Sequence, residues 1–135
     1  MKTGFEKALF LGLVAAGLIA TAATPAAAHH SFAAFNMSSD KTVTGTVRQV
    51  DWTNPHIWIW IDVPNDKGGA DTFGFEGMSP NFLARRNWTK STLKPGDKIT
   101  VVFRPLRDGS NGGMFVNAKT PDGKVLTGGG GQAGQ

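Results

Sequence analysis

Two adjacent histidines, His29 and His30, follow a run of alanines, and a third, His56, follows an Asn-Pro pair further along the chain. Cleavage immediately before His29 would give this residue a free α-amino group, which with its imidazole can chelate one metal ion. A second imidazole, from His30 or His56, would complete a nitrogen-rich site of the kind that Cu(II) favours. The remaining coordination could come from Glu76, Asp51 or a water molecule. These residues predict a site for copper or zinc.

The same histidines also fit purely structural roles. His29 and His30 can be polar residues at a frayed chain end, and His56 can cap a turn or hydrogen-bond a backbone carbonyl. His30 would be the second residue of the mature chain, which departs from the usual amino-terminal Cu(II)/Ni(II) motif with histidine third. Met37 is the only nearby thioether. Metal binding is therefore a hypothesis that needs support from the fold.

The first 28 residues have the pattern of a signal peptide. Lys2 and Lys7 precede an uncharged apolar segment at 8–20, and small residues allow cleavage after Ala28. The apolar segment is too short to span a bilayer comfortably. The pattern predicts a periplasmic or secreted protein with no stable membrane span after cleavage. Because the chain has no cysteine, it has no disulfides, no thiolate ligands and no lipoprotein anchor.

The rest of the chain predicts one small β-domain at 29–127, with an N-terminal arm at 29–40 and a disordered glycine-rich tail at 128–135. Ser79 is a candidate N-cap and Pro80 a first helical residue, which predicts a short helix at 80–87. Segments rich in alternating or β-branched residues predict strands at 41–52, 56–63, 71–77, 98–106 and 114–120. This order is typical of a five-stranded OB-like barrel with one helix between strands three and four.

The second predicted strand separates two kinds of side chain. Its aliphatic residues, Ile57, Ile59, Ile61 and Val63, fall on one face with a period of two, which predicts that they enter the core. The opposite face carries His56, Trp58 and Trp60. A hairpin through 64–70 would place residue 63 opposite 71, Trp58 near Glu76 and Trp60 near Gly74, which would leave room for the indole. Glu76 would then lie diagonally from His56.

The tryptophan face admits two interpretations. Trp58 and Trp60 can pack beneath the N-terminal arm, whose Phe32 and Phe35 need a place to bury. Alternatively, they form a binding face for a periplasmic partner protein or a small ligand, with arginines nearby to hold an anion. The candidate arginines are Arg104 and Arg107, with Arg85 and Arg86 as further members of such an anion site. Export argues against nucleic acid as the partner, although OB-like barrels often bind it.

Independent catalysis is not expected. Ser31 beside His30 is not a catalytic pair, because adjacent residues in an extended segment point to opposite sides. The sequence has no G-x-S-x-G, H-E-x-x-H or glycine-rich phosphate-binding motif.

Four segments of the mature chain together resemble a family of short exported proteobacterial proteins of unknown function. They are HHSFAAF, VDWTNPHIWIWI, GMSPNFLARRNWTKSTLKPGD and RPLRDGSNGGMFV. The resemblance covers nearly the whole mature chain, and its motif positions are His29, His30, Ser31, Phe32, Trp52, Asn54, Pro55 and His56. It implies a periplasmic setting but supplies no activity, so it assigns no catalytic role to these residues.

Overall fold

The computed structural model describes residues 32–128. The predicted signal peptide, His29, His30 and the tail from 129 lie outside the described residues. Between 32 and 128 the chain forms a short 3-10 helix, η1 (Phe32–Ala34), and an α-helix, α1 (Pro80–Ala84). The strands are β1 (Lys41–Asp51), β2 (Trp58–Pro64), β3 (Ala70–Glu76), β4 (Lys98–Pro105), β5 (Gly112–Lys119) and β6 (Val125–Thr127). Neither helix of this part is long and apolar enough to cross a membrane.

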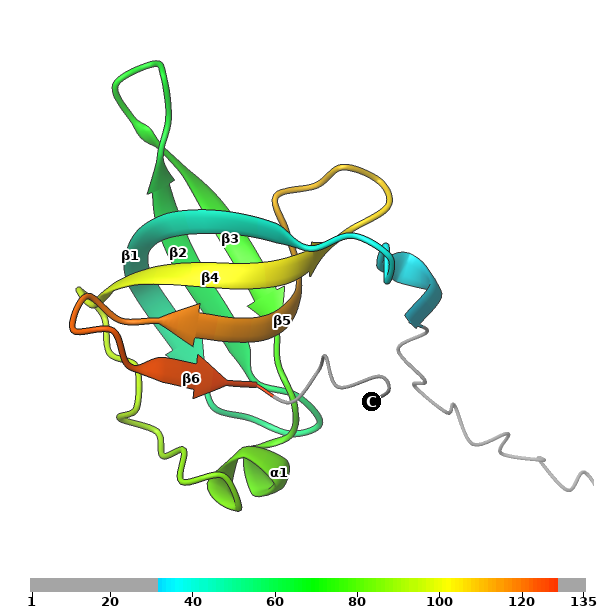
Figure 1. The fold of residues 1–135 in the computed structure, drawn as a ribbon, viewed down its shortest axis with the longest axis vertical. Helices are drawn as coiled ribbons and strands as arrows, with labels where there is room; N and C mark the ends of the chain where they lie inside the picture. Colours follow the sequence, from blue (N-terminus) through cyan, green and yellow to red (C-terminus); the bar gives the residue numbers. More distant parts are fainter. Residues whose placement is uncertain (1–31, 129–135) are drawn as a thin grey trace, which may run out of the picture.

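Strands β1 to β5 form a closed barrel. The neighbours run in the order β3-β2-β1-β4-β5, and a parallel pairing of β3 with β5 closes the cylinder (Figure 1). Long strand β1 pairs with both β2 and β4, and α1 lies between the third and fourth strands in the sequence. The predicted OB-like architecture is confirmed. Strand β6, for which the sequence analysis predicted no strand, extends the sheet along the edge of β5.

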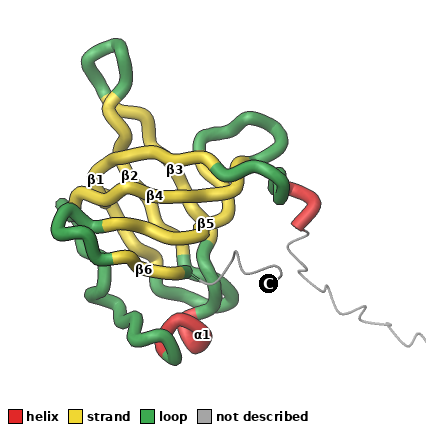
Figure 2. Tube along the Cα trace, in the orientation of Figure 1, coloured by secondary structure: helices red, strands yellow, loops and turns green. Residues whose placement is uncertain are grey.

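The barrel interior is filled by the inward side chains of alternating strand residues. Ile57, Ile59 and Ile61 are fully buried, as the period of two predicted, whereas Val63, the fourth residue of that face, is only partly buried against the core. Leu83 of α1 is also buried in this cluster, so the helix packs one end of the barrel. The strands curve around this interior (Figure 2), and the buried side chains form one continuous core. Its other main contributors are Val47, Phe75, Trp88, Leu93, Ile99, Val101, Phe103, Phe115, Ala118 and Leu126.

Two adjacent glycines make the closure of the barrel possible. A Cβ on Gly112 would lie 2.0 Å from the carbonyl oxygen of Gly74, and one on Gly113 would lie 1.9 Å from that of Arg104. Gly112 also has a φ of +132°, which side chains other than glycine rarely adopt. No larger residue fits where β5 passes between β3 and β4. The predicted fifth strand began at 114, two residues after its observed start.

Helix α1 begins as predicted but is shorter than 80–87. Ser79 Oγ accepts a hydrogen bond from the backbone N–H of Phe82, and Pro80 follows at the first turn. Asn87 adopts a φ of +63°, and the Trp88 N–H donates to Leu83 O at 3.1 Å. These features are those of a Schellman motif, in which a left-handed residue ends the helix. The basic residues Arg85 and Arg86 therefore lie in the terminating turn.

Strand β1 has one irregularity, where its register with β2 shifts between Val47 and Gln49. Gly45, earlier in the same strand, allows a close approach, because a Cβ there would lie 2.5 Å from Asp62 O. The irregularity lies in the strand that pairs on both sides, where a bulge increases the local bend and twist.

Candidate functional site

The backbone of the residue that follows His56 holds it at one end of the barrel. The residue after it, Ile57, donates its N–H to Met78 O at 3.1 Å and accepts from the Gly77 N–H at 2.9 Å. These two bonds extend the pairing of β2 with β3 beyond the strand ends. The backbone next to His56 is therefore fixed against the segment that follows Glu76.

The imidazole of His56 is bonded to a buried carboxylate. His56 Nδ1 lies 2.5 Å from Glu76 Oε1, and the Glu76 side chain is only 9% exposed. The register of the hairpin explains this contact, because Val63 pairs with Asp71, Trp58 with Glu76 and Trp60 with Gly74. All three predicted pairings are confirmed, as is the diagonal placement of Glu76 and His56. A metal ion on this imidazole would bind Nε2, since Nδ1 is engaged by the carboxylate.

Glu76 belongs to a row of outward-facing residues that the sequence analysis did not identify. Trp58 pairs with Glu76, Glu76 with Met114, and Met114 with Arg104, across four neighbouring strands. We call these four residues the covered row. Although the row faces away from the barrel core, Glu76 is 7% exposed, Met114 8% and the Arg104 side chain 12%, while Trp58 is half-buried. Another part of the chain must therefore cover most of this row.

The N-terminal arm provides this cover. Phe35 forms an isolated antiparallel bridge with Leu106 and is 6% exposed. The Asn36 N–H donates to Pro105 O at 2.8 Å, and the Arg107 N–H to Ala34 O at 3.0 Å. The arm thus continues the sheet beyond the end of β4 and lays Phe35 against the covered row.

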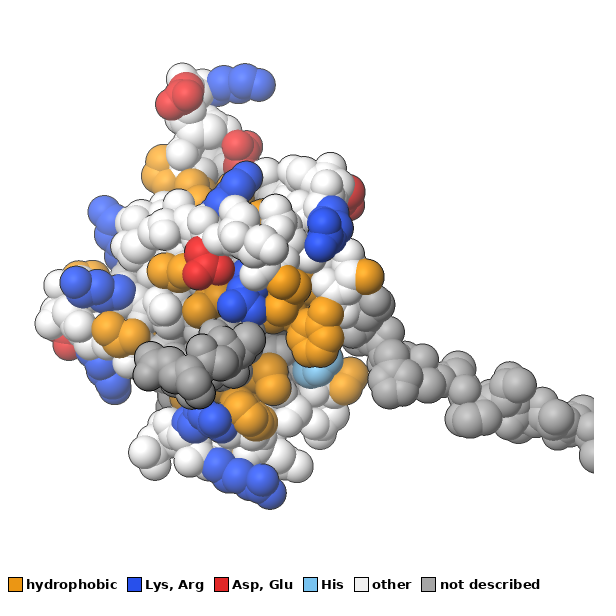
Figure 3. Space-filling view, turned by 45° about the vertical axis from the view of Figure 1, so that its right-hand side comes forward, with side chains coloured by type: hydrophobic (Ala, Val, Ile, Leu, Met, Phe, Trp, Pro, Cys, Tyr) orange, Lys and Arg blue, Asp and Glu red, His pale blue; other side chains and the backbone are white. Residues whose placement is uncertain are grey.

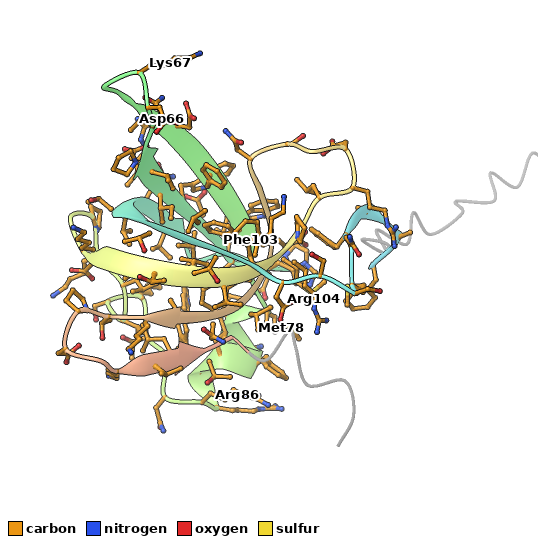
Figure 4. The ribbon with its side chains drawn as sticks, turned by 45° about the horizontal axis from the view of Figure 1, so that its top comes forward. Asp66, Lys67, Met78, Arg86, Phe103 and Arg104 are labelled. Atoms are coloured by element: carbon orange, nitrogen blue, oxygen red, sulfur yellow. The ribbon has the colours of Figure 1, made fainter. Side chains whose placement is uncertain are left out.

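Both candidate anion-binding arginines contact the arm. Arg107 Nε donates to Phe35 O at 3.1 Å. Arg104 has its guanidinium 4.0 Å from Met37 Sδ and 3.5 Å from Asp40 Oδ1. In Figure 4, Arg104 lies on the side from which the arm extends, whereas Arg86 lies in the turn that ends α1. The Arg86 guanidinium packs 3.7 Å over the Phe82 ring, so the four predicted arginines are divided between two places.

Two neighbouring pockets lie between the arm and the barrel. The first, of about 100 Å³, is lined by Phe32, Phe35, His56, Glu76, Gly77, Met78, Met114 and Phe115. The second, of about 300 Å³, is lined by Ala34, Phe35, Trp58, Gly74, Glu76, Leu106 and Gly113. Hydrophobic side chains surround the histidine on this face (Figure 3). His56 and Glu76 are the titratable side chains among the lining residues of the first pocket.

The two tryptophans have different surroundings. Their rings stack at a centroid distance of 5.5 Å, and the Trp60 Nε1–H donates to Asp51 Oδ2 at 2.9 Å. Trp58 lines the second pocket with Phe35, as expected if the arm packs over this face, but Phe32 remains 66% exposed. Asp51 and Glu76 pair with Trp58 from opposite sides, which separates their strands by about 9.5 Å. Asp51 is therefore not grouped with His56.

Of the four predicted metal ligands, the structure brings together His56 and Glu76, while His29 and His30 lie outside the described residues. Within 32–128, no group of three or more His, Cys, Asp or Glu side chains could hold a metal ion. The sequence analysis did not identify Met78 and Met114 as candidate site residues, although both line the first pocket with His56. The alternation with inward Phe115 indicates that Met114 faces outward, but only barrel closure places it beside Glu76.

Comparison with protein families matches residues 16–117 to a family described as "Family of unknown function (DUF6152)". The chain belongs to this family. Searches of curated proteins and of solved structures found no match.

Proposed function

We propose that this member of the DUF6152 family is an exported binding protein that holds a copper or zinc ion through His56 and the mature N-terminus. The observation that carries the proposal is the bond between His56 Nδ1 and the buried Glu76 carboxylate, at 2.5 Å. The ion would bind His56 Nε2, with His29 supplying its imidazole and α-amino nitrogen. His30 would be a further imidazole ligand.

A histidine bonded to a carboxylate is a common arrangement around protein metal ions. The second ring nitrogen of a metal-bound histidine usually donates to a carboxylate or carbonyl, which fixes the tautomer and makes the ligand more basic. Glu76 is suited to this supporting role because it touches Nδ1 and lies deeper than the imidazole, 9% against 32% side-chain exposure. The sequence suggested Glu76 as a metal ligand. In the proposed site Glu76 instead orients the imidazole of His56, which binds the metal ion.

The position of the arm supports participation of the N-terminus. Phe32 lines the same pocket as His56 and Glu76, and His30 precedes it by two residues. Two extended residues span about 7 Å, so the chain length permits His30, and His29 one residue earlier, to reach this pocket. Signal cleavage after Ala28 would place the free amine on His29. A site of imidazole and amine nitrogens favours copper over magnesium or calcium.

A second candidate function is binding of a small apolar molecule. The pocket of about 300 Å³ beside Trp58 is mostly apolar and lies under the same arm. Such a ligand would change Trp58 fluorescence in metal-free protein. Its binding would not depend on His56.

The test begins with protein exported from its full precursor. Mass spectrometry should show His29 as the first residue, and titration should show binding of Cu(II) or Zn(II). The variant His56→Ala should abolish tight binding. Glu76→Gln should weaken it by about 10- to 100-fold, as expected for loss of a partner that supports a metal ligand.

Two controls separate the roles of the ligands. Asp71→Asn removes a carboxylate from the β2–β3 hairpin, where it bonds Asn65 Nδ2 at 2.9 Å, and should leave affinity unchanged. One extra residue before His29 should weaken binding by removing the amine chelate. Binding that survives both His56→Ala and the extension would overturn the proposal.

A further inference from the structure

We propose that the pocket beneath the arm binds copper as Cu(I), with the thioether sulfurs of Met78 and Met114 beside the imidazole of His56. This inference rests on the proposed metal-binding function and specifies the ion, its oxidation state and two additional ligands.

The three donor residues come from different segments, since His56 precedes β2, Met78 follows β3 and Met114 lies in β5, yet their backbones are fixed relative to one another. Met78 O accepts the N–H of Ile57, the residue after His56, at 3.1 Å. Met114 is the register partner of Glu76, which bonds His56. All three donor residues line the pocket of about 100 Å³. Side-chain adjustment about these fixed backbones would bring the donor atoms to one ion.

The chemistry of these donors selects the ion. Thioethers are soft ligands that favour Cu(I), and imidazole also suits copper, whereas hard cations prefer oxygen ligands. The chain has no cysteine, so methionine is its only source of sulfur ligands. Two of its four methionines line this pocket together with the imidazole of His56.

The electrostatics of the pocket also favour a monovalent ion. Besides the polar pair His56 and Glu76, the lining is dominated by Phe32, Phe35, Phe115 and the two methionines. Burying an unbalanced charge among apolar side chains is costly. The imidazole and the thioethers are neutral ligands, so the charge of a bound Cu(I) ion would be balanced by the carboxylate of Glu76, a residue that is 7% exposed. The same carboxylate would leave one charge of a divalent ion unbalanced.

The position of Met114 distinguishes it from an ordinary core methionine. Met114 faces outward from β5, whereas the next residue, Phe115, faces the core. Met114 is nevertheless only 8% exposed, and it lies on the side of the barrel that the arm covers. A methionine that only fills space can be replaced by leucine with little consequence, because the two side chains have similar volumes. A methionine that binds copper through sulfur cannot.

The test uses mature protein under anaerobic, reducing conditions. Cu(I) affinity is measured by competition with a chromogenic Cu(I) chelator, for the wild type, Met78→Leu, Met114→Leu and the double variant. Each single substitution should weaken Cu(I) binding by at least about tenfold, the scale on which a metal site responds to loss of a supporting group. Met37→Leu is the matched control, because Met37 contacts Arg104 and does not line this pocket. It should bind as the wild type does.

X-ray absorption at the copper edge provides a second readout. Since there is no cysteine, sulfur scatterers around bound copper must come from methionine, and they should disappear in the double variant. Cu(I) bound without sulfur scatterers, or Cu(II) bound without any Cu(I) affinity, would overturn this inference and leave the proposed function standing. Absence of binding for Cu(I), Cu(II) and Zn(II) alike would overturn both.

Discussion

Strands β4 and β5 contribute to two stretches of the outer barrel surface, one buried and one exposed to solvent. Where the arm crosses, β4 and β5 contribute Arg104 and Met114 to the buried covered row. Near the other end of these strands lies what we call the open stretch, formed by Thr44, Lys98, Thr100 and Lys119. Thr44 and Thr100 share a hydrogen bond between their hydroxyls at 2.8 Å. Both lysines are exposed.

The difference shows how the arm converts surface into a site. In the open stretch, water can satisfy every polar group, so the side-chain bonds there contribute little to stability. Beneath the arm, a carboxylate without partners would cost free energy, and Glu76 is accordingly bonded to His56. Contacts in the covered row should therefore matter far more than those in the open stretch, although neither belongs to the core.

Removing the cover should have the largest effect. Phe35→Ala deletes an aromatic side chain that is 6% exposed, and we expect a loss of about 3 kcal/mol in the free energy of unfolding. Urea unfolding followed by circular dichroism would measure it. The control is Phe32→Ala, which removes a ring that is 66% exposed and should change stability by less than about 0.5 kcal/mol. Equal effects of the two substitutions would contradict the assignment of Phe35 as the anchor of the arm.

An intermediate effect is expected where Trp60 lies across β3. A Cβ on Gly74 would be 2.5 Å from the Trp60 ring, so Gly74→Ala should displace the indole and cost about 1–3 kcal/mol, as overpacking does. Tryptophan fluorescence and urea unfolding report the two consequences. Gly69→Ala is the control, because the nearest atom to its Cβ would be at 3.6 Å. A stable Gly74→Ala variant with unchanged fluorescence would contradict the close packing of the Trp60 ring against Gly74.

The smallest effect is expected in the open stretch. Thr44→Val removes the hydroxyl bond to Thr100, but Thr100 can bond water instead. The free energy of unfolding should change by less than about 0.5 kcal/mol. A double-mutant cycle with Thr100→Val should give a similarly small coupling between the two residues. Coupling as large as the effect of Phe35→Ala would remove the distinction between the two stretches.

Much of the fold followed from local patterns in the sequence. The period of two in β2 identified Ile57, Ile59 and Ile61 as core residues, and all three are buried. The short loop after Pro64 made the register of the β2–β3 hairpin predictable, because a loop of a given short length can join two antiparallel strands in only a few ways. The start of α1 was also predicted, but its end was not, although Asn87 is of a residue type that can adopt the left-handed conformation ending a helix.

Only part of the candidate site could be predicted from the sequence. His56 and Glu76 could be paired because they belong to one hairpin. Met78 follows Glu76 by two residues but lies just past the predicted end of that strand at 77. Met114 could not be grouped with them, because alternation shows which face a residue occupies but not which distant strand lies beside it. Arg104 and Arg107 resembled anion-binding residues, yet their described contacts include Met37, Asp40 and the carbonyl of Phe35 in the arm.

By itself, the sequence determined the succession of strands and helix along the chain, the inward face of β2 and the pairing that brings Glu76 to His56. These features depend on interactions between residues that are close along the chain. Only the tertiary structure decided that β5 closes against β3 and that the arm crosses beyond β4. Those contacts join distant segments, and they are possible because Gly112 and Gly113 lack side chains where three backbones meet. Closure and cover together turn an outward-facing row into a buried pocket.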